Sequence, residues 1–252
     1  MNRRSGLGLV MPMAGRGSRF ARLGIREPKP LIDLAGRPFF WWAVESLRRV
    51  VPLRAMVFVV LDEHCRDFDI DSRIRAIYPE AQVLSIPDVT SGAAETARIG
   101  IDALVHEGPV AINDCDHAFF CPDLSFALTQ LATDADKALL SFESTDPAYS
   151  YVVLGPGGRP TGTVEKVVAS PYAIAGCYFF SGVERFRRLY EAYEKNCPYG
   201  ELFISGLFNQ SSIDDTSMLL LHTSRHWSFG TPEELERTDR STIITAFAGF
   251  DA

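Results

Sequence analysis

Residues 7–20 read Leu-Gly-Leu-Val-Met-Pro-Met-Ala-Gly-Arg-Gly-Ser-Arg-Phe, a short apolar run that leads into a turn rich in glycine and arginine. Glycine lets backbone N–H groups come close to a ligand, and arginine neutralises negative charge. A second basic cluster, Pro-Lys-Pro-Leu-Ile, follows at residues 28–32. The first forty residues hold eight Lys or Arg and two acids, although the whole chain has a net charge of −7. The pattern predicts a strand that ends at a binding loop for a polyphosphate.

The composition limits the class of protein. At 252 residues with 46% hydrophobic content, the chain is long enough for one large α/β domain with an ordinary core. A pI near 5.3 argues against a nucleic-acid partner, and no apolar run is long enough to span a membrane. The five cysteines form no CxxC pair, which favours a reduced, cytoplasmic protein. The apolar stretch after Arg3 and Arg4 is too short for a signal peptide.

Strand-like and helix-like segments alternate along the first half of the chain. Apolar runs at 55–61, 81–86 and 109–113 predict strands, and helical patterns occupy 38–47 and 92–104. The alternation predicts an α/β fold with a Rossmann-like, mixed, mostly parallel sheet flanked by helices. The second half is richer in β-structure. We expect strands at 138–142, 151–154, 163–168, 173–180 and 218–221, a turn at 155–158, and helices at 183–193, 201–209 and 232–237.

The glycine-rich turn departs from two common phosphate-binding motifs. No Gly-Lys-Ser/Thr follows it, as a Walker A motif requires, and Phe20 occupies the third glycine position of a dinucleotide fingerprint. Residues 11–20 and 28–32 instead resemble the signature loop of the sugar-phosphate nucleotidyltransferase family, most closely in capsule and surface-polysaccharide pathways. The resemblance implies that Arg19 and Lys29 are catalytic and contact the phosphates of the nucleoside triphosphate, with Arg19 on the leaving pyrophosphate. It also implies nucleotide binding by Met13, Ala14, Gly15, Arg16, Gly17 and Ser18.

Two further segments of the first half extend the resemblance. Residues 90–96 resemble the family's second glycine motif, which implies that Ser91 and Gly92 bind the nucleotide; a plain helix start is the alternative. Residues 113–120 resemble the acidic motif at a strand end that holds the divalent metal. Two acids one residue apart can reach one hard cation, so we expect Mg²⁺, with Mn²⁺ as an alternative, on Asp116 and Asp114. The alternative is a turn aspartate.

The second half continues the family's order of motifs as far as residue 233. The Glu165–Lys166 pair resembles the family's Glu–Lys pair, which implies a catalytic Lys166 and an acceptor-binding Glu165; a surface ion pair is the alternative. Residues 175–180 resemble the glycine–x–tyrosine strand and imply acceptor binding at Gly176. One position departs from the family: Ser228 stands where an Asp is common as a second metal ligand. Either Asp114 takes that role, or metal binding relies on one acid and substrate phosphates.

The resemblance implies a glycosyltransferase-A-like architecture and one nucleotidyltransferase domain over residues 1–252. Its NTP-binding half is expected at about 1–135 and its acceptor-binding half at about 136–252. The implied reaction transfers NMP from an NTP, with CTP, dTTP or UTP favoured, to a sugar 1-phosphate or a similar small phosphorylated acceptor. Pyrophosphate is released, and the product is expected to serve surface-polysaccharide synthesis.

Other functions stay open at this point. One is a cytidylyltransferase for a non-sugar phosphate, and another is a non-catalytic nucleotide-binding protein on the same scaffold. A glycosyltransferase is a third, because Asp114-Cys115-Asp116 also fits that class's DxD motif. A homo-oligomer is compatible with all of them.

Overall fold

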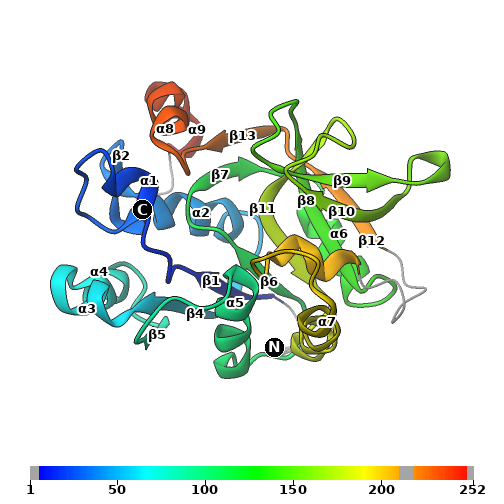
Figure 1. Ribbon diagram of the computed structural model, residues 1–252, viewed down its shortest axis with the longest axis horizontal. Coiled ribbons are helices and arrows are strands. Elements are labelled where there is room, and N and C mark those ends of the chain that lie inside the picture. The colour runs from blue at the N-terminus through cyan, green and yellow to red at the C-terminus, as the bar shows by residue number, and fades with distance from the viewer. Residues whose placement is uncertain (1–5, 210–217, 249–252) are drawn as a thin grey trace.

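A nine-stranded sheet organises the protein, as the computed structural model of residues 6–209 and 218–248 shows (Figure 1). The strand order is β10-β9-β11-β6-β1-β4-β5, with β8 paired to β11 and β12 paired to β8. Arg3 and Arg4 lie outside the described residues. The strands are β1 (Leu7–Pro12), β4 (Leu53–Leu61), β5 (Gln82–Ile86), β6 (Val110–Asn113), β8 (Lys137–Glu143), β9 (Ser150–Leu154), β10 (Pro160–Glu165), β11 (Tyr172–Phe180) and β12 (Met218–His222).

Seven of these nine strands run in the same direction. β1 pairs in parallel with β4 and β6, and β4 pairs in parallel with β5. β11 is antiparallel to β6, β8 and β9, so β8 and β9 share the direction of β6, and β12 is parallel to β8. Within this sheet only β11 and β10 are reversed. The expected mixed, mostly parallel sheet is therefore confirmed.

The central strands are buried on both faces of the sheet, which explains their continuous apolar runs. Leu9 and Met11 of β1 belong to one hydrophobic cluster, and Val10 between them belongs to another. Helices α5 (Ala93–Ala103) and α7 (Val183–Asn196) cover the Val10 face and lie next to each other (Figure 1). The other face is covered by α2 (Phe39–Arg48), α4 (Ile70–Ile77), α6 (Leu124–Leu131) and α9 (Arg240–Phe247).

Short elements complete the described chain. They are α1 (Ser18–Ala21), η1 (Lys29–Leu31), β2 (Asp33–Leu34), β3 (Arg37–Pro38), α3 (Asp62–Phe68), β7 (His117–Phe120), η2 (Pro156–Gly158), η3 (Ile204–Asn209), β13 (Arg225–Ser228) and α8 (Pro232–Arg237). Within residues 6–209 and 218–248, no helix combines the length and apolar character that crossing a membrane requires.

Two elements of the second half differ from expectation. The strand expected at 163–168 ends at Glu165, because Lys166 has a left-handed φ of 55° that interrupts extended backbone. The helix expected at 201–209 is only the short 3-10 helix η3. There the Thr163 hydroxyl donates to the Ser205 carbonyl at 2.7 Å, and the Asn209 amide donates to the Thr163 carbonyl at 2.9 Å. These bonds tie η3 to β10 and compete with a regular α-helix.

The sequence does not reveal the two-stranded antiparallel ribbon of β7 and β13. In its register His117 lies opposite Ser228, and Phe119 lies opposite His226. Because strand side chains alternate between faces, these four share one face of the ribbon. Trp227 lies on the other face, in contact with the Phe120 ring. The ribbon thus carries two histidines to the same place.

Candidate active site

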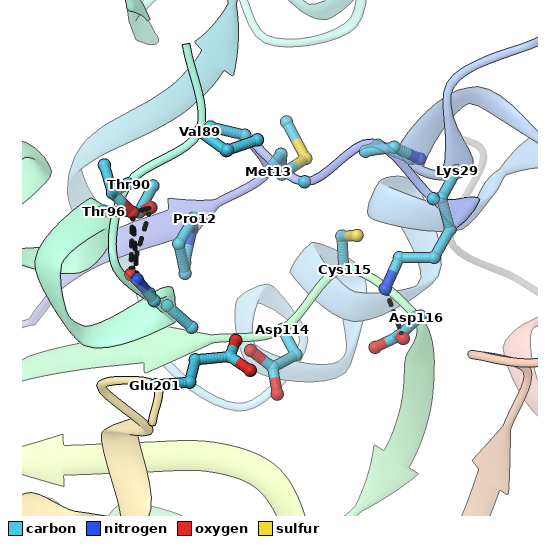
Figure 2. Close-up of a pocket in the computed structure, with 16 residues that line it drawn as sticks. Pro12, Met13, Lys29, Val89, Thr90, Thr96, Asp114, Cys115, Asp116 and Glu201 are labelled. Atoms are coloured by element: carbon cyan, nitrogen blue, oxygen red, sulfur yellow. Dashed lines mark hydrogen bonds and ion pairs between the residues drawn. The ribbon is translucent and has the colours of Figure 1, made fainter. Parts of the chain in front are cut away.

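The functional candidates gather at the carboxyl ends of β1 and β6, where parallel sheets bind ligands. The loop after β1 and the loop after β6 line a cleft of about 480 Å³, which we call the larger cleft (Figure 2). Eight residues expected from the sequence line it: Met13, Ala14, Gly15, Gly17, Lys29, Gly92, Asp114 and Asp116. Thr90, Thr96, Cys115 and Glu201 also line it and were not predicted as site residues.

A second cavity of about 190 Å³, the smaller cavity, shares Asp114 and Asp116 with the larger cleft. We call these two residues the aspartate wall, because their side chains border both spaces. Of the expected residues, Arg19 and Gly176 also line the smaller cavity. The rest of its lining comes largely from the ribbon and from the second half of the chain: His117, Phe142, Ala148, Tyr149, Ile174, Ala175, His226, Ser228, Gly230, Thr231 and Glu234.

Gly176 sets the position of Asp114 at a fork in the sheet. One edge of β11 pairs with β6 from Cys177 onward and with β9 at Ala173, so the two partner strands diverge around Gly176. The Asp114 N–H donates to the Gly176 carbonyl at 2.9 Å. Gly176 has φ 70°, and a Cβ there would lie 2.8 Å from Asp114 Oδ2. Both the backbone and the crowding therefore require glycine.

Lys29 reaches the aspartate wall from the start of η1 (Figure 2). Its Nζ lies 2.7 Å from Asp116 Oδ2. Burial opposes the charge of Lys29, but its acidic neighbours, Asp116 above all, together outweigh burial and raise the lysine pKa. Burial likewise opposes ionisation of Asp116, but Lys29 holds the pKa of that carboxyl below its usual range. The pair is therefore ionised at neutral pH.

Asp114 has a different electrostatic environment. Its burial and the neighbouring Asp116 carboxylate raise its pKa to about 7. Its side chain accepts no hydrogen bond from the described residues, whereas Asp116 is paired with Lys29. Two carboxylates with one ammonium leave a negative site that a hard cation would complement.

The donor set fits Mg²⁺ only if substrate and water complete it. Within the described parts of the chain, no three His, Cys, Asp or Glu side chains are grouped to hold a metal. Mg²⁺ usually keeps several waters and binds through one or two carboxylates plus substrate phosphates. The aspartate wall offers that arrangement, while Ser228 adds a hydroxyl to the lining of the smaller cavity.

Helix α2 supports both strands that flank the aspartate wall. The Asn113 side-chain amide donates to the Ala43 carbonyl at 3.0 Å, and the Phe119 N–H donates to Ser46 Oγ at 2.9 Å. On the ribbon side, the Phe229 N–H donates to the Asp116 carbonyl at 3.0 Å. Each bond contributes about 1 kcal/mol, and together they fix the loop from two directions.

Three residues expected at the nucleotide do not line either cavity. Arg16 is exposed and contacts two acids, with Nη2 2.8 Å from Asp88 Oδ1 and Nε 3.4 Å from Glu63 Oε1. Ser18 begins α1. The Ser91 N–H and hydroxyl both donate to Glu95 Oε2, at 2.8 and 2.5 Å, just before α5.

The Glu165–Lys166 pair lies at the end of β10, beside the smaller cavity but outside its lining. Glu165 accepts hydrogen bonds from Ser150, at 2.7 Å, and from Ser205. Lys166 is exposed, and its Nζ lies 5.6 Å from the centre of the Phe203 ring. The Lys166 N–H donates to the Tyr149 carbonyl at 3.1 Å, so its backbone is anchored to the cavity lining. Among the described residues, the alternative ion pair between Glu165 and Lys166 is not found.

The site contains residues that sequence reasoning missed. Glu234 closes a capping box with Thr231 at the start of α8, and Tyr149 donates to its carboxylate. The Thr-x-x-Glu spacing is a recognisable signal for that box. His117 and His226 give no such signal, because only the ribbon register brings them together. Burial lowers the pKa of His117 to about 4 and that of His226 well below its usual value, so both rings are neutral near pH 7.

Comparison with known proteins places this chain in a wider group. The family described as the MobA-like NTP transferase domain matches residues 10–175. The bifunctional protein GlmU of Roseobacter denitrificans is 28% identical over 204 residues, which cover 78% of this chain and 43% of GlmU. The chain thus spans less than half the length of that curated relative.

Two solved structures share the fold. A nucleoside-diphosphate-sugar pyrophosphorylase from Vibrio cholerae RC9 has a TM-score of 0.76 at 22% identity, covering 91% of this chain and 98% of that one. An inositol-1-phosphate CTP transferase from T. maritima has a TM-score of 0.74 at 15% identity, covering 95% and 96%.

Proposed function

Because the chain belongs to the family of MobA-like NTP transferase domains, we propose that it transfers NMP from an NTP to a sugar 1-phosphate or a similar small phosphorylated acceptor. Pyrophosphate is the second product. The observation that carries the proposal is the pair of cavities separated by the aspartate wall. The glycine-rich loop lines the larger cleft, which suits the NTP, and the smaller cavity suits the acceptor.

The proposed chemistry needs charge and alignment rather than a strong base. A phosphate monoester has a second pKa of about 6, so the acceptor is already largely dianionic at pH 7. One of its oxygens attacks the α-phosphorus, and the bond from that phosphorus to the pyrophosphate oxygen breaks. The barrier comes from repulsion between anions and from charge on the leaving group, so positioning and electrostatic stabilisation supply the catalysis.

The basic residues of the first forty positions meet that need from two sides. Lys29 brings an ammonium to the aspartate wall within the larger cleft. Arg19 lines the smaller cavity and not the larger cleft, so we assign its guanidinium to phosphates reached from the acceptor side rather than to the leaving pyrophosphate expected from the sequence. Lys166 lines neither cavity, but its backbone N–H donates to the carbonyl of Tyr149, which lines the smaller one, and we assign its ammonium to the acceptor phosphate from that side.

Asp114 and Asp116 would hold the divalent ion. When bound, Mg²⁺ or Mn²⁺ supplies positive charge to the phosphoryl oxygens. The two carboxylates stand where both substrates would meet, so they also orient the reacting groups. The half-buried Asp114 carboxylate, which accepts no hydrogen bond from the described residues and lines both cavities, supports this assignment beside the sequence motif.

The choice of nucleotide, acceptor and pathway rests on the sequence motif. The wording of the loop at residues 11–20 favours CTP, dTTP or UTP and a cytoplasmic role in surface-polysaccharide precursor synthesis. The names of the Vibrio and T. maritima proteins, a sugar-nucleotide pyrophosphorylase and a CTP transferase, are compatible with both a sugar and a non-sugar acceptor.

A pyrophosphate-release screen tests the proposal. ATP, CTP, GTP and UTP, together with dTTP, are each combined with a panel of phosphorylated acceptors and Mg²⁺. We expect release with at least one pair and none when either substrate is omitted. NTP binding without release from any pair would instead support a non-catalytic nucleotide-binding protein. Turnover of a nucleoside-diphosphate sugar in place of an NTP would support a glycosyltransferase.

A further inference from the structure

Glu201 lines the larger cleft but has no part in the proposed chemistry. Two other acids line that cleft: Asp116 is paired with Lys29, and Asp114 would hold the metal. Glu201 is exposed, and its carboxylate has no hydrogen bond or ion pair with any residue in the described parts of the chain. A negative charge in a cleft that receives a polyphosphate opposes binding unless it faces hydrogen-bond donors of the ligand.

The backbone next to Glu201 is fixed to the loop that precedes α5. The Leu202 N–H donates to the Ser91 carbonyl at 3.0 Å, and the Ala94 N–H donates to the Leu202 carbonyl at 2.9 Å. A Cβ on Gly92 would lie 2.5 Å from both the nitrogen and the carbonyl oxygen of Leu202, so the approach requires glycine. These contacts hold Glu201 at a defined place beside residues 90–96.

The larger cleft has two chemically different ends. Figure 2 shows Lys29 at one end, Thr90 and Thr96 at the other, and Asp114 between them, with the Glu201 side chain directed toward Asp114. The phosphates of an NTP belong at the Lys29 end, where an ammonium attracts them. The nucleoside then lies toward Thr90 and Thr96. Its ribose joins the base to the phosphates, so the ribose occupies the middle of the cleft, where the Glu201 carboxylate points.

We propose that Glu201 accepts hydrogen bonds from the ribose hydroxyls and thereby selects ribonucleoside triphosphates over their 2′-deoxy forms. An ionised carboxylate only accepts hydrogen bonds, and its two oxygens match the two neighbouring hydroxyl donors of a ribose. Dinucleotide-binding folds use an acidic side chain on a ribose hydroxyl in the same way. The inference rests on the proposed function, because it takes the larger cleft as the NTP site. It favours CTP or UTP over dTTP, which the sequence motif leaves together.

Binding of matched nucleotide pairs tests this without an acceptor. Calorimetry in Mg²⁺ compares CTP, UTP, ATP and GTP with dCTP, dUTP, dATP and dGTP, each pair differing only in the 2′-hydroxyl. We expect the best-bound NTP to bind at least about tenfold more tightly than its 2′-deoxy form, because the latter loses a hydrogen bond to a charged group. Equal binding within the pair overturns the inference and leaves nucleotidyl transfer intact. No binding by any of the eight overturns the NTP site as well.

Substitution of Glu201 then asks whether this carboxylate is the group that recognises the hydroxyl. In Glu201→Ala we expect the preference for the ribonucleotide to fall below about threefold, because the coupling between the carboxylate and the 2′-hydroxyl is lost. Glu201→Gln keeps one acceptor oxygen without the charge and should lie between wild type and Glu201→Ala. Glu191→Ala is the matched control: Glu191 is exposed on α7, lines neither cavity and should keep the full preference. An unchanged preference in Glu201→Ala overturns the role of Glu201.

Two other uses of the carboxylate give different results in the same variants. If Glu201 held the divalent ion, Glu201→Ala would weaken Mn²⁺ binding in the electron paramagnetic resonance spectrum; we expect the affinity of wild type. If Glu201 accepted from an amino group of the base, Glu201→Ala would change the preference for CTP over UTP and leave that for CTP over dCTP. Either result overturns the inference. If the ribose preference depends on Glu201 but no acceptor yields pyrophosphate, the proposed function fails and this inference stands.

Discussion

The two aspartates of the aspartate wall have opposite pKa shifts: the pKa of Asp116 is lowered and that of Asp114 is raised. Asp116 is paired with Lys29, while Asp114 is half-buried beside Asp116, accepts no hydrogen bond from the described residues and has its pKa raised to about 7. A partly buried carboxylate beside a second one destabilises a protein unless a ligand compensates. We interpret Asp114 as a residue that lowers the stability of the ligand-free protein and is kept because its carboxylate serves the proposed function.

The first prediction concerns the two phosphate-facing cations. Lys29→Ala and Arg19→Ala should each lower kcat by about a hundredfold or more, because each removes a charge that stabilises the transition state. Arg22→Ala is the matched control: Arg22 is exposed, lines neither cavity and should keep wild-type turnover. Near-normal turnover of Lys29→Ala or Arg19→Ala with saturating substrates would refute the role of that residue. Circular dichroism checks that each variant keeps its fold.

The second prediction concerns the metal. Activity should require Mg²⁺ or Mn²⁺, disappear with EDTA and return when excess Mg²⁺ is added. Asp116→Asn should raise the Mg²⁺ concentration for half-maximal activity more than Asp114→Asn does. Mild and equal effects of both substitutions would favour a turn role for the two aspartates. Titration of activity against Mg²⁺ makes the comparison.

At the scale of elements, the strand ends decide which side chains meet. Lys166 stands where β10 stops, and its left-handed backbone turns the chain away from the sheet. Glu165 points instead toward Ser150 and Ser205. The two neighbours in sequence therefore face different surroundings, which makes their roles separable by mutation.

The third prediction tests Lys166 at that strand end. If its ammonium serves the acceptor phosphate, Lys166→Ala should raise the acceptor KM or lower kcat with little change in NTP affinity. Lys166→Arg should be partly active, because it keeps the charge but replaces a compact ammonium with a planar fork. Steady-state kinetics with each substrate varied in turn provides the measurement. Normal turnover of Lys166→Ala at low acceptor concentration would leave Lys166 a surface residue.

The helices and strands that could be predicted are those whose own residues form a recognisable hydrophobic pattern. β1, β4 and β6 are buried on both faces, so their apolar runs stand out in the sequence. β7 and β13 do not stand out, because each is stabilised by a partner more than a hundred positions away. Helices α3, α4, α6 and α9 were not predicted. The strand end at Lys166 depends on one left-handed residue, which no periodicity reveals.

The residues of the candidate site likewise fall into those that the sequence predicts and those that it does not. The glycine-rich loop, Lys29 and the two aspartates were predicted from the resemblance of residues 11–32 and 113–120 to the family's motifs, and all of them line the larger cleft. Arg16 and Ser91 could not, because their acidic neighbours Glu63, Asp88 and Glu95 decide where the side chains point. The two histidines of the smaller cavity depend on the ribbon register, so the sequence predicted no role in the site for either of them.

At the scale of the whole molecule, ligand binding should raise the free energy of unfolding. Strands from both halves of the chain share one sheet, so binding in the larger cleft should raise the unfolding temperature. At an NTP concentration of about 100 times Kd, the stabilisation is about 2.7 kcal/mol. That corresponds to a rise in Tm of about 5–10 °C for a chain of this size.

Thermal unfolding of wild type and Lys29→Ala, with and without NTP and Mg²⁺, measures this fourth prediction. Lys29→Ala should lose most of the NTP-induced rise, and Arg22→Ala should keep it. No rise in wild type with any NTP would argue against nucleotide binding in the larger cleft. The ligand-free transition of each variant serves as its own reference.

The fork at Gly176 also determines at which point of its synthesis the chain can complete the aspartate wall. Chains leave the ribosome from the N-terminus, so β1, β4 and β6 emerge well before β11. Asp114 obtains its bond to the Gly176 carbonyl only after 62 further residues have been added, 176 minus 114. A nascent chain that ends before residue 172 lacks β11 and carries Asp114 without that support. The proposed substrates would therefore meet a complete candidate site only after β11 has joined the sheet.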